Sequence, residues 1–187
     1  MPNHILNFKN IDTNNISFSK GKYYGKYCSI NINYIIETDK KCEMLIQGPK
    51  MTTPFGISKY DDSSTSYYLD MSFGDLSDEL EEFYELIENI KRKCKRKRKK
   101  WNIDNQQFLD NIKVNDRNIY PPLLRLKIPM MNNDFHFNVF DDCRNKIDYN
   151  SILANSLCTP IFQVKNVWIN ESNYGITIQL LQLKVHI

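Results

Sequence analysis

Residues 20–27, KGKYYGKY, combine side chains that could bind a nucleic acid, because lysines alternate there with tyrosines. Binding a single strand without sequence preference needs flat aromatic faces on which bases stack and positive charges that follow the phosphates. The stretch therefore predicts the floor of a DNA groove, on the lead-in to a strand. The alternative is that some of the tyrosines, about half, pack inward with their hydroxyl groups at the rim. The candidate residues are Lys20, Lys22, Tyr23, Tyr24, Lys26 and Tyr27.

A second concentration of charge lies at residues 91–100, where nine of ten residues are basic and only Cys94 interrupts the run. Such a block repels itself, so we expect a mobile, solvated loop when no ligand is bound. The run has the composition of a nuclear import signal, and it could also contact DNA through the release of counterions. We favour an auxiliary electrostatic arm that acts on phosphates. Its candidate residues are Arg92, Lys95, Arg96, Lys97, Arg98, Lys99 and Lys100.

Several isolated aromatic and basic residues complete the candidate site. Trp101 follows the basic run and is equally suited to stack a base or to anchor the loop to the body of the protein. Phe55 is either a stacking platform or a core plug, whereas Trp168 stands in an apolar strand and is predicted to be core. Surface lysines on a sheet more often only increase solubility. The remaining candidates are Lys59, Tyr60, Tyr68, Arg125 and Lys127.

Catalytic and metal-binding chemistry finds little support in the sequence. It contains no phosphate-binding loop, no Gly-rich dinucleotide fingerprint and no Ser/His/Asp arrangement. The pairs Asp61–Asp62 and Asp141–Asp142 could bind magnesium in a nuclease, but adjacent aspartates are more often turn formers. The five cysteines are irregularly spaced and the three histidines are far from any cysteine pair. We therefore expect no enzyme activity, no cofactor and no metal site, and the cysteines indicate free thiols in a reducing compartment.

The elements that must position these side chains are mostly strands. Apolar and polar residues alternate in short segments, and the last two segments form a predicted hairpin around residues 170–173. The segments are residues 28–36, 66–73, 120–130, 135–141, 158–170 and 174–187.

Between these strands, residues 77–90 change to a helical period, with Leu80, Phe83, Ile87 and Ile90 on one face. Many short strands around one long, mid-chain amphipathic helix predict a mainly β fold, a small closed or nearly closed barrel. No linker or repeat divides residues 1–187, so we expect one domain, into which residues 89–102 are inserted as a basic helix end and loop.

The charge distribution separates the basic run from the rest of the chain. The net charge is +3, but without the nine basic residues of the run 16 basic residues remain against 22 acidic ones, a net charge of −6. One concentrated positive element on an acidic body indicates a polyanionic partner. No stretch approaches the ~18 apolar residues of a membrane-spanning helix, so no membrane partner is expected.

Four segments together resemble a known family. They are KMTTPFGISKY, SYYLDMSF, YPPLLRLKIP and VWINESNYGITIQLLQLKV, in this order over about residues 45–187. The chain is similar in them to the single-stranded DNA-binding proteins of nucleo-cytoplasmic large DNA (giant) viruses, themselves similar to those of short-tailed bacteriophages. The resemblance implies an OB-fold, single-stranded DNA binding, and a role in viral DNA replication, recombination and repair. The chain departs from the phage proteins in ending on QLKVHI instead of an acidic tail, and in its basic run.

The resemblance also implies where and with what the protein would act. Its expected partners are single-stranded DNA, viral replication proteins and a second copy of the chain, and its expected location is the viral factory in the host cytoplasm, the nucleus or the virion. Two other functions stay open. One is a virion-associated protein that condenses duplex DNA or RNA through residues 91–100. The other is a structural module whose basic run docks an acidic protein.

Overall fold

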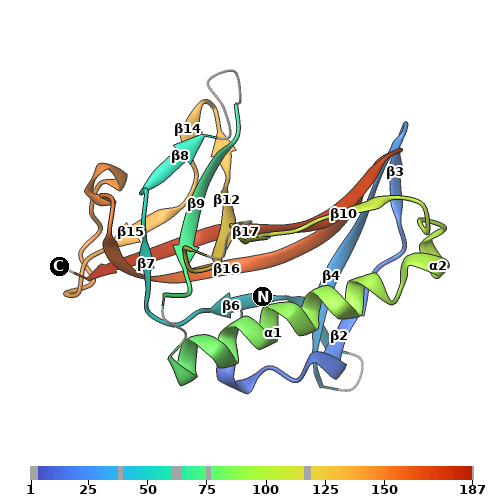
Figure 1. Ribbon diagram of the computed structural model, residues 1–187, viewed down its shortest axis with the longest axis horizontal. Helices are drawn as coiled ribbons and strands as arrows, with labels where there is room; N and C mark the ends of the chain where they lie inside the picture. The colour runs from blue at the N-terminus through green and yellow to red at the C-terminus, as the bar shows by residue number, and fades with distance from the viewer. Residues whose placement is uncertain (1–3, 38–39, 60–64, 75–76, 116–118, 187) are drawn as a thin grey trace.

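The computed structural model describes residues 4–37, 40–59, 65–74, 77–115 and 119–186 and consists mainly of β-strands (Figure 1). Five strands form a closed ring, because β16 pairs with both β17 and β7. The neighbours β12 and β17 run parallel, and the other neighbours in the ring run antiparallel. This ring confirms the predicted OB-fold-like barrel. In ring order the strands are β7 (Met51–Thr53), β9 (Tyr67–Ser72), β12 (Leu123–Ile128), β17 (Asn173–His186) and β16 (Ser156–Ile169).

The apolar side chains of the predicted alternating segments fill the barrel interior. Leu69 and Met71 of β9 and Leu124 and Leu126 of β12 are fully buried, because alternate side chains of a strand point to opposite faces of the sheet. The hairpin of β16 and β17 also turns where the sequence predicts, at residues 170–173. The segment predicted as a single strand at 135–141 is instead divided into two short strands.

The two longest strands, β16 and β17, extend beyond the barrel (Figure 1). Strand β4 (Tyr27–Glu37) pairs with the end of β16, β3 (Lys22–Tyr24) pairs with β4, and β10 (Gln107–Leu109) pairs with the start of β17. We call this extension, made of β3, the start of β4 and the adjoining ends of β16 and β17, the arm. The remaining strands are β1 (Ile5–Asn7), β2 (Ile16–Phe18), β5 (Lys40–Glu43), β6 (Leu45–Gln47), β8 (Ile57–Lys59), β11 (Ile112–Lys113), β13 (Met130–Met131), β14 (Asp134–Phe135) and β15 (Asn138–Phe140). Short 3-10 turns are η1 (Phe8–Asn10), η2 (Thr13–Asn15) and η3 (Tyr149–Ser151).

Helix α1 (Asp78–Lys95) has the predicted acidic start and basic end, and its buried face includes Phe83, Ile87 and Ile90. The prediction that a loop follows this helix is wrong. The helix includes half of the basic run, and α2 (Arg98–Trp101) follows directly. Helical periodicity turns Lys91 and Cys94 into the interior, and burial raises the pKa of the Cys94 thiol to about 12. Among the described residues, no helix is both long and apolar enough to cross a membrane.

Candidate nucleic-acid interface

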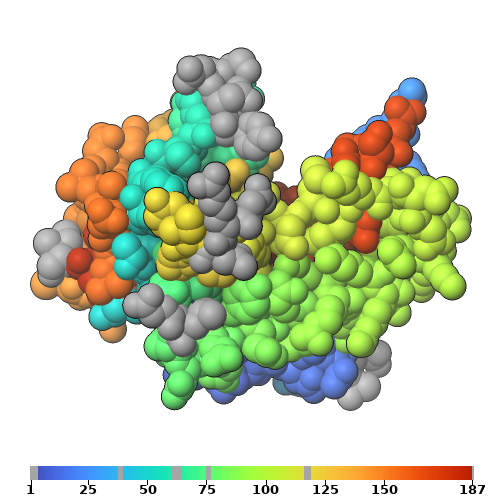
Figure 2. Space-filling model, viewed as in Figure 1, coloured from blue at the N-terminus to red at the C-terminus, as the bar shows by residue number. Residues whose placement is uncertain are grey.

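A groove of about 350 Å³ lies where the barrel meets the arm. We call it the barrel groove. In Figure 2 the surface is hollowed between the lobe that contains β8 and β9 and the arm, whose tip is red and blue. Five strands far apart in the sequence supply its aromatic and basic side chains. These are Tyr27, Tyr68, Lys113, Arg125, Lys127 and Trp168.

Arg125 is held in the barrel groove by a buried carboxylate. Its Nε and Nη2 atoms donate hydrogen bonds to Asp70 Oδ1 and Oδ2, both at 2.8 Å. The guanidinium carbon lies over the Tyr68 ring, 5.2 Å from the centroid. Asp70 is on the outward side of β9 as predicted, but it is only 2% exposed, because Arg125 is its partner in register on β12. A bidentate pair against an aromatic face fixes the guanidinium, so Tyr68 and Arg125 form one rigid unit.

Trp168 lines the barrel groove and does not belong to the core, which corrects the prediction. It is half-buried on β16, opposite Gly175 of β17. A Cβ atom at Gly175 would lie 2.7 Å from Trp168 Cζ2, so the glycine makes room for the indole against the sheet. A signal for this was present in the sequence. The hairpin turn pairs position 168 with position 175, and a glycine inside a strand often marks the close approach of another group.

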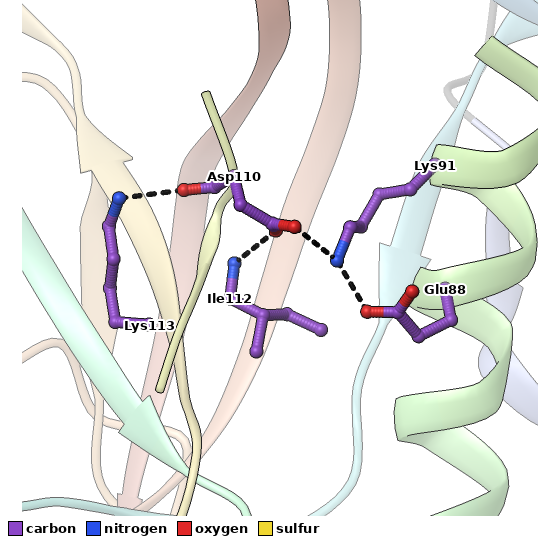
Figure 3. Close-up of polar contacts among 5 residues, drawn as sticks. All are labelled: Glu88, Lys91, Asp110, Ile112 and Lys113. Carbon is purple, nitrogen blue, oxygen red and sulfur yellow. Dashed lines mark hydrogen bonds and ion pairs between the residues drawn. The ribbon is translucent and has the colours of Figure 1, made fainter. Parts of the chain in front are cut away.

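Lys113 lies on one wall of the barrel groove, and a side chain of helix α1 holds this wall in place (Figure 3). The buried ammonium of Lys91 pairs with Asp110 Oδ2 at 2.7 Å and also contacts Glu88. Asp110 Oδ1 accepts a hydrogen bond from the Ile112 N–H, and the Asp110 carbonyl accepts one from Lys113 Nζ at 2.7 Å. Burial and the charge of Arg125 lower the pKa of Lys113. Lys91, a residue of the basic run, therefore holds the groove wall in place. Lys113 is a groove residue that the sequence did not predict.

A second groove of about 630 Å³ lies between the arm and α2, and we call it the arm groove. Trp101 lines it and also packs edge-on against Phe18, with ring centroids 5.2 Å apart, so both predicted roles of this residue remain compatible with its position. Tyr27 lines both grooves, which places them side by side. The predicted site residues that line the arm groove are Lys20, Tyr23, Lys26, Tyr27, Lys100 and Trp101.

The tyrosines of residues 20–27 all remain at the surface. Tyr23, Tyr24 and Tyr27 are 76%, 63% and 39% exposed, so the alternative that about half of them pack inward is wrong. The physical reason is that β3 and the start of β4 form the tip of a hairpin (Figure 1). Lys22 is also exposed but lines neither groove. Lys26 forms an ion pair with Glu171 at 2.8 Å, which joins the two hairpin tips of the arm.

The basic run is spread over several faces and does not form one arm. Lys95 lies over the Phe108 ring, 4.3 Å from its centroid, and Arg98 lies 3.9 Å from Asp104. Lys99 is exposed and lines neither groove. The others, Arg92, Arg96 and Lys97, surround a separate pocket on a different face of α1.

Phe55 and Lys59 are two further predicted residues that line neither groove. Phe55 is 62% exposed, so it is not a core plug, and it lines neither groove. Lys59 lies over the Tyr67 ring, 5.1 Å from its centroid. Tyr60 and the pair Asp61–Asp62 lie outside the described residues.

The aspartates at 141 and 142 have structural roles. Asp141 closes a turn through hydrogen bonds from Asn145. Hydrogen bonds from Lys184 and His186 lower the pKa of Asp142 to about 2. Within the part of the chain that the structure describes, no group of three or more His, Cys, Asp or Glu side chains could hold a metal ion.

The sequence matches no protein-family model and, at a significant level, no curated protein. Among solved structures, the fold is similar to the crystal structure of gp2.5, a single-stranded DNA binding protein encoded by bacteriophage T7. The TM-score is 0.54 at 10% sequence identity, and the match covers 78% of this chain and 87% of that chain. The similarity at this level shows that the two chains share a fold.

Proposed function

We propose that this protein binds single-stranded DNA without sequence preference along the barrel groove and the arm groove. The observation that carries the proposal is the barrel groove itself, where aromatic and basic side chains from five strands meet. Aromatic faces stack successive bases, and basic side chains follow the phosphates. OB-folds bind oligonucleotides on the face of their second and third strands, which here are β9 and β12. The solved neighbour that shares the fold is itself a single-stranded DNA binding protein.

We further propose, on the resemblance to the giant-virus proteins, that this binding serves viral DNA replication, recombination and repair. Replicating viral DNA forms in the factory in the host cytoplasm or in the nucleus, and the proposed partners are the viral replication proteins. Crosslinking of the protein to newly made viral DNA in infected cells would test this role. Crosslinking to packaged genomes alone would contradict it and favour a condensing role in the virion.

Competition binding tests the activity itself. Poly-dT, duplex DNA and RNA of equal length compete for the protein, and we expect poly-dT to bind most tightly because its unpaired bases are free to stack. Equal affinity for all three would contradict the proposal, since phosphates alone would then account for binding.

Intrinsic fluorescence tests the location. The chain contains two tryptophans, and one lines each groove. In a Trp101→Phe variant the remaining Trp168 should be quenched by poly-dT, and in a Trp168→Phe variant the remaining Trp101 reports on the arm groove. Absence of quenching in both variants would place the DNA elsewhere.

A further inference from the structure

A third pocket, of about 270 Å³, lies on a different face of α1 from the two grooves. We call it the cationic cradle. The side chains of Lys91 and Lys95 point from α1 toward the segment of β10, at Asp110 and Phe108. Lys93 instead donates a hydrogen bond to the Thr13 carbonyl, in the segment that runs along the other side of the helix (Figure 1). The cradle is lined by Thr13, Asn14, Asn89, Arg92, Lys93, Arg96 and Lys97.

The cradle concentrates positive charge that the nearby Asp12 offsets only in part. Its four basic residues stand at positions i, i+1, i+4 and i+5 of the run, so they share one side of the chain. Among the described residues none of the four forms a salt bridge, although the body of the protein is acidic. Desolvation is the largest cause that lowers the pKa of Lys93; the charges of Lys97 and Arg96 lower it further, and the charge of Asp12 opposes them. An anion bound here would relieve this repulsion.

The chemistry of the lining selects phosphates and not bases. Among the residues that the structure describes, no aromatic or apolar side chain lines the cradle, so it offers no surface for base stacking. The planar guanidinium groups of its two arginines present N–H donors in a geometry that matches phosphate oxygens. An acidic peptide would meet the same charge, but the cradle has no apolar lining to seat the peptide's other side chains.

A short basic segment of the chain joins the cradle to the arm groove. Lys97 lines the cradle, and Lys100, three residues later, lines the arm groove. The residues between them, Arg98 and Lys99, are both exposed and basic. Four consecutive basic residues, 97–100, therefore connect the cradle with the arm groove along the chain, and Arg98 among them lies near Asp104.

We propose that the cradle binds backbone phosphates of the same DNA strand after it leaves the arm groove, so that a long strand wraps around α2. This inference rests on the proposed function and deepens it: the grooves bind bases and phosphates, and the cradle binds phosphates alone. A strand that fills only the grooves does not reach the cradle, and a longer strand does.

Strand length tests the inference. The variant Arg92→Gln/Arg96→Gln removes two exposed charges and keeps good helix formers in place. Its affinity is measured for oligo-dT of about 5 and of about 16 nucleotides, the range that one OB barrel covers. We expect unchanged affinity for the short strand and weaker affinity for the long one. With the long strand, the slope of log affinity against log salt should flatten by about 1.4 for two lost phosphate contacts.

A charge-matched control is Lys50→Gln/Lys146→Gln, which removes two exposed charges that line none of the three pockets. The inference would be overturned if the cradle variant lost affinity equally for both strand lengths, or lost none. A loss of affinity confined to duplex DNA would also overturn it. A different result would show that the proposed function itself is wrong. In that case Trp168→Ala leaves the affinity for the short strand unchanged, whatever the cradle variant does.

Discussion

The barrel groove and the arm groove contain the same kinds of side chain but hold them differently. In the barrel groove three groups have a fixed support: Asp70 holds Arg125, Gly175 seats Trp168, and the Asp110 carbonyl accepts a hydrogen bond from Lys113. At the tip of the arm, Tyr23 and Tyr24 are largely exposed on a hairpin.

One fold can therefore divide the contributions to binding between a rigid groove and an adaptable one. Groups fixed before binding lose little conformational freedom when the ligand arrives, so the barrel groove should contribute most of the affinity. Exposed aromatic side chains on a hairpin tip must be ordered at that moment, so they contribute less, and they can adapt to different bases.

The largest expected effect is on stability. Replacing Asp70 by Ala leaves the mostly buried Arg125 without its carboxylate, which should lower the free energy of unfolding by about 3–5 kcal/mol. The equivalent change in the arm, Glu171→Ala, breaks an exposed pair and should cost less than about 1 kcal/mol. Urea unfolding of both variants measures the difference. Similar values for the two would show that the barrel groove is no better supported than the arm.

The next effect is on binding at the barrel groove. Trp168→Ala and Tyr68→Ala should each weaken poly-dT binding by about 1–3 kcal/mol for every base whose stacking is lost. Fluorescence anisotropy with labelled oligo-dT measures the loss. Tyr120→Ala is the control, because this tyrosine is 68% exposed and lines neither groove. Unchanged affinity in both groove variants would refute the assignment of the barrel groove.

A smaller loss is expected in the arm. Tyr23→Ala should weaken binding by about 1 kcal/mol or less, near the low end for a stacked base. Tyr24 lines neither groove but packs beside Tyr27, so Tyr24→Ala should cost still less. Tyr27→Ala should cost more than either, because Tyr27 lines both grooves. The same anisotropy titration ranks the three. A greater loss for Tyr24 than for Trp168 would reverse the proposed division between arm and barrel.

The smallest effect concerns the ion pair at the arm tip. Glu171→Gln releases Lys26 for a phosphate and removes a negative charge from the arm groove. Affinity for oligo-dT should rise slightly, and the salt dependence should steepen by up to about 0.7, the value for one phosphate on a single strand. A salt titration of the variant beside the wild type measures this. A flatter slope would mean that Lys26 contacts DNA only while Glu171 positions it.

Local patterns of the sequence determined the elements of this fold. The period-two alternation of β9, β12 and β17 and the helical period of α1 each follow from residues close together in the chain. The hairpin of β16 and β17 was also predictable, because a polar turn separates two apolar strands. The interleaved lysines and tyrosines of residues 20–27 pointed to a surface that the structure places at a groove.

Only the tertiary structure decided how the candidate site is assembled. Trp168 has the sequence context of a core residue, and the packing of its indole against Gly175 across the hairpin places it in the groove. The charges of residues 91–100 are uniform along the chain. Helical geometry and the contacts of α1 turn Lys91 inward to Asp110 and Lys100 toward the arm groove, and gather Arg92 and Arg96 at the cradle. The physical reason is that a local pattern sets the direction of a side chain from its own element, whereas its partners come from strands and helices that only the folded chain brings near.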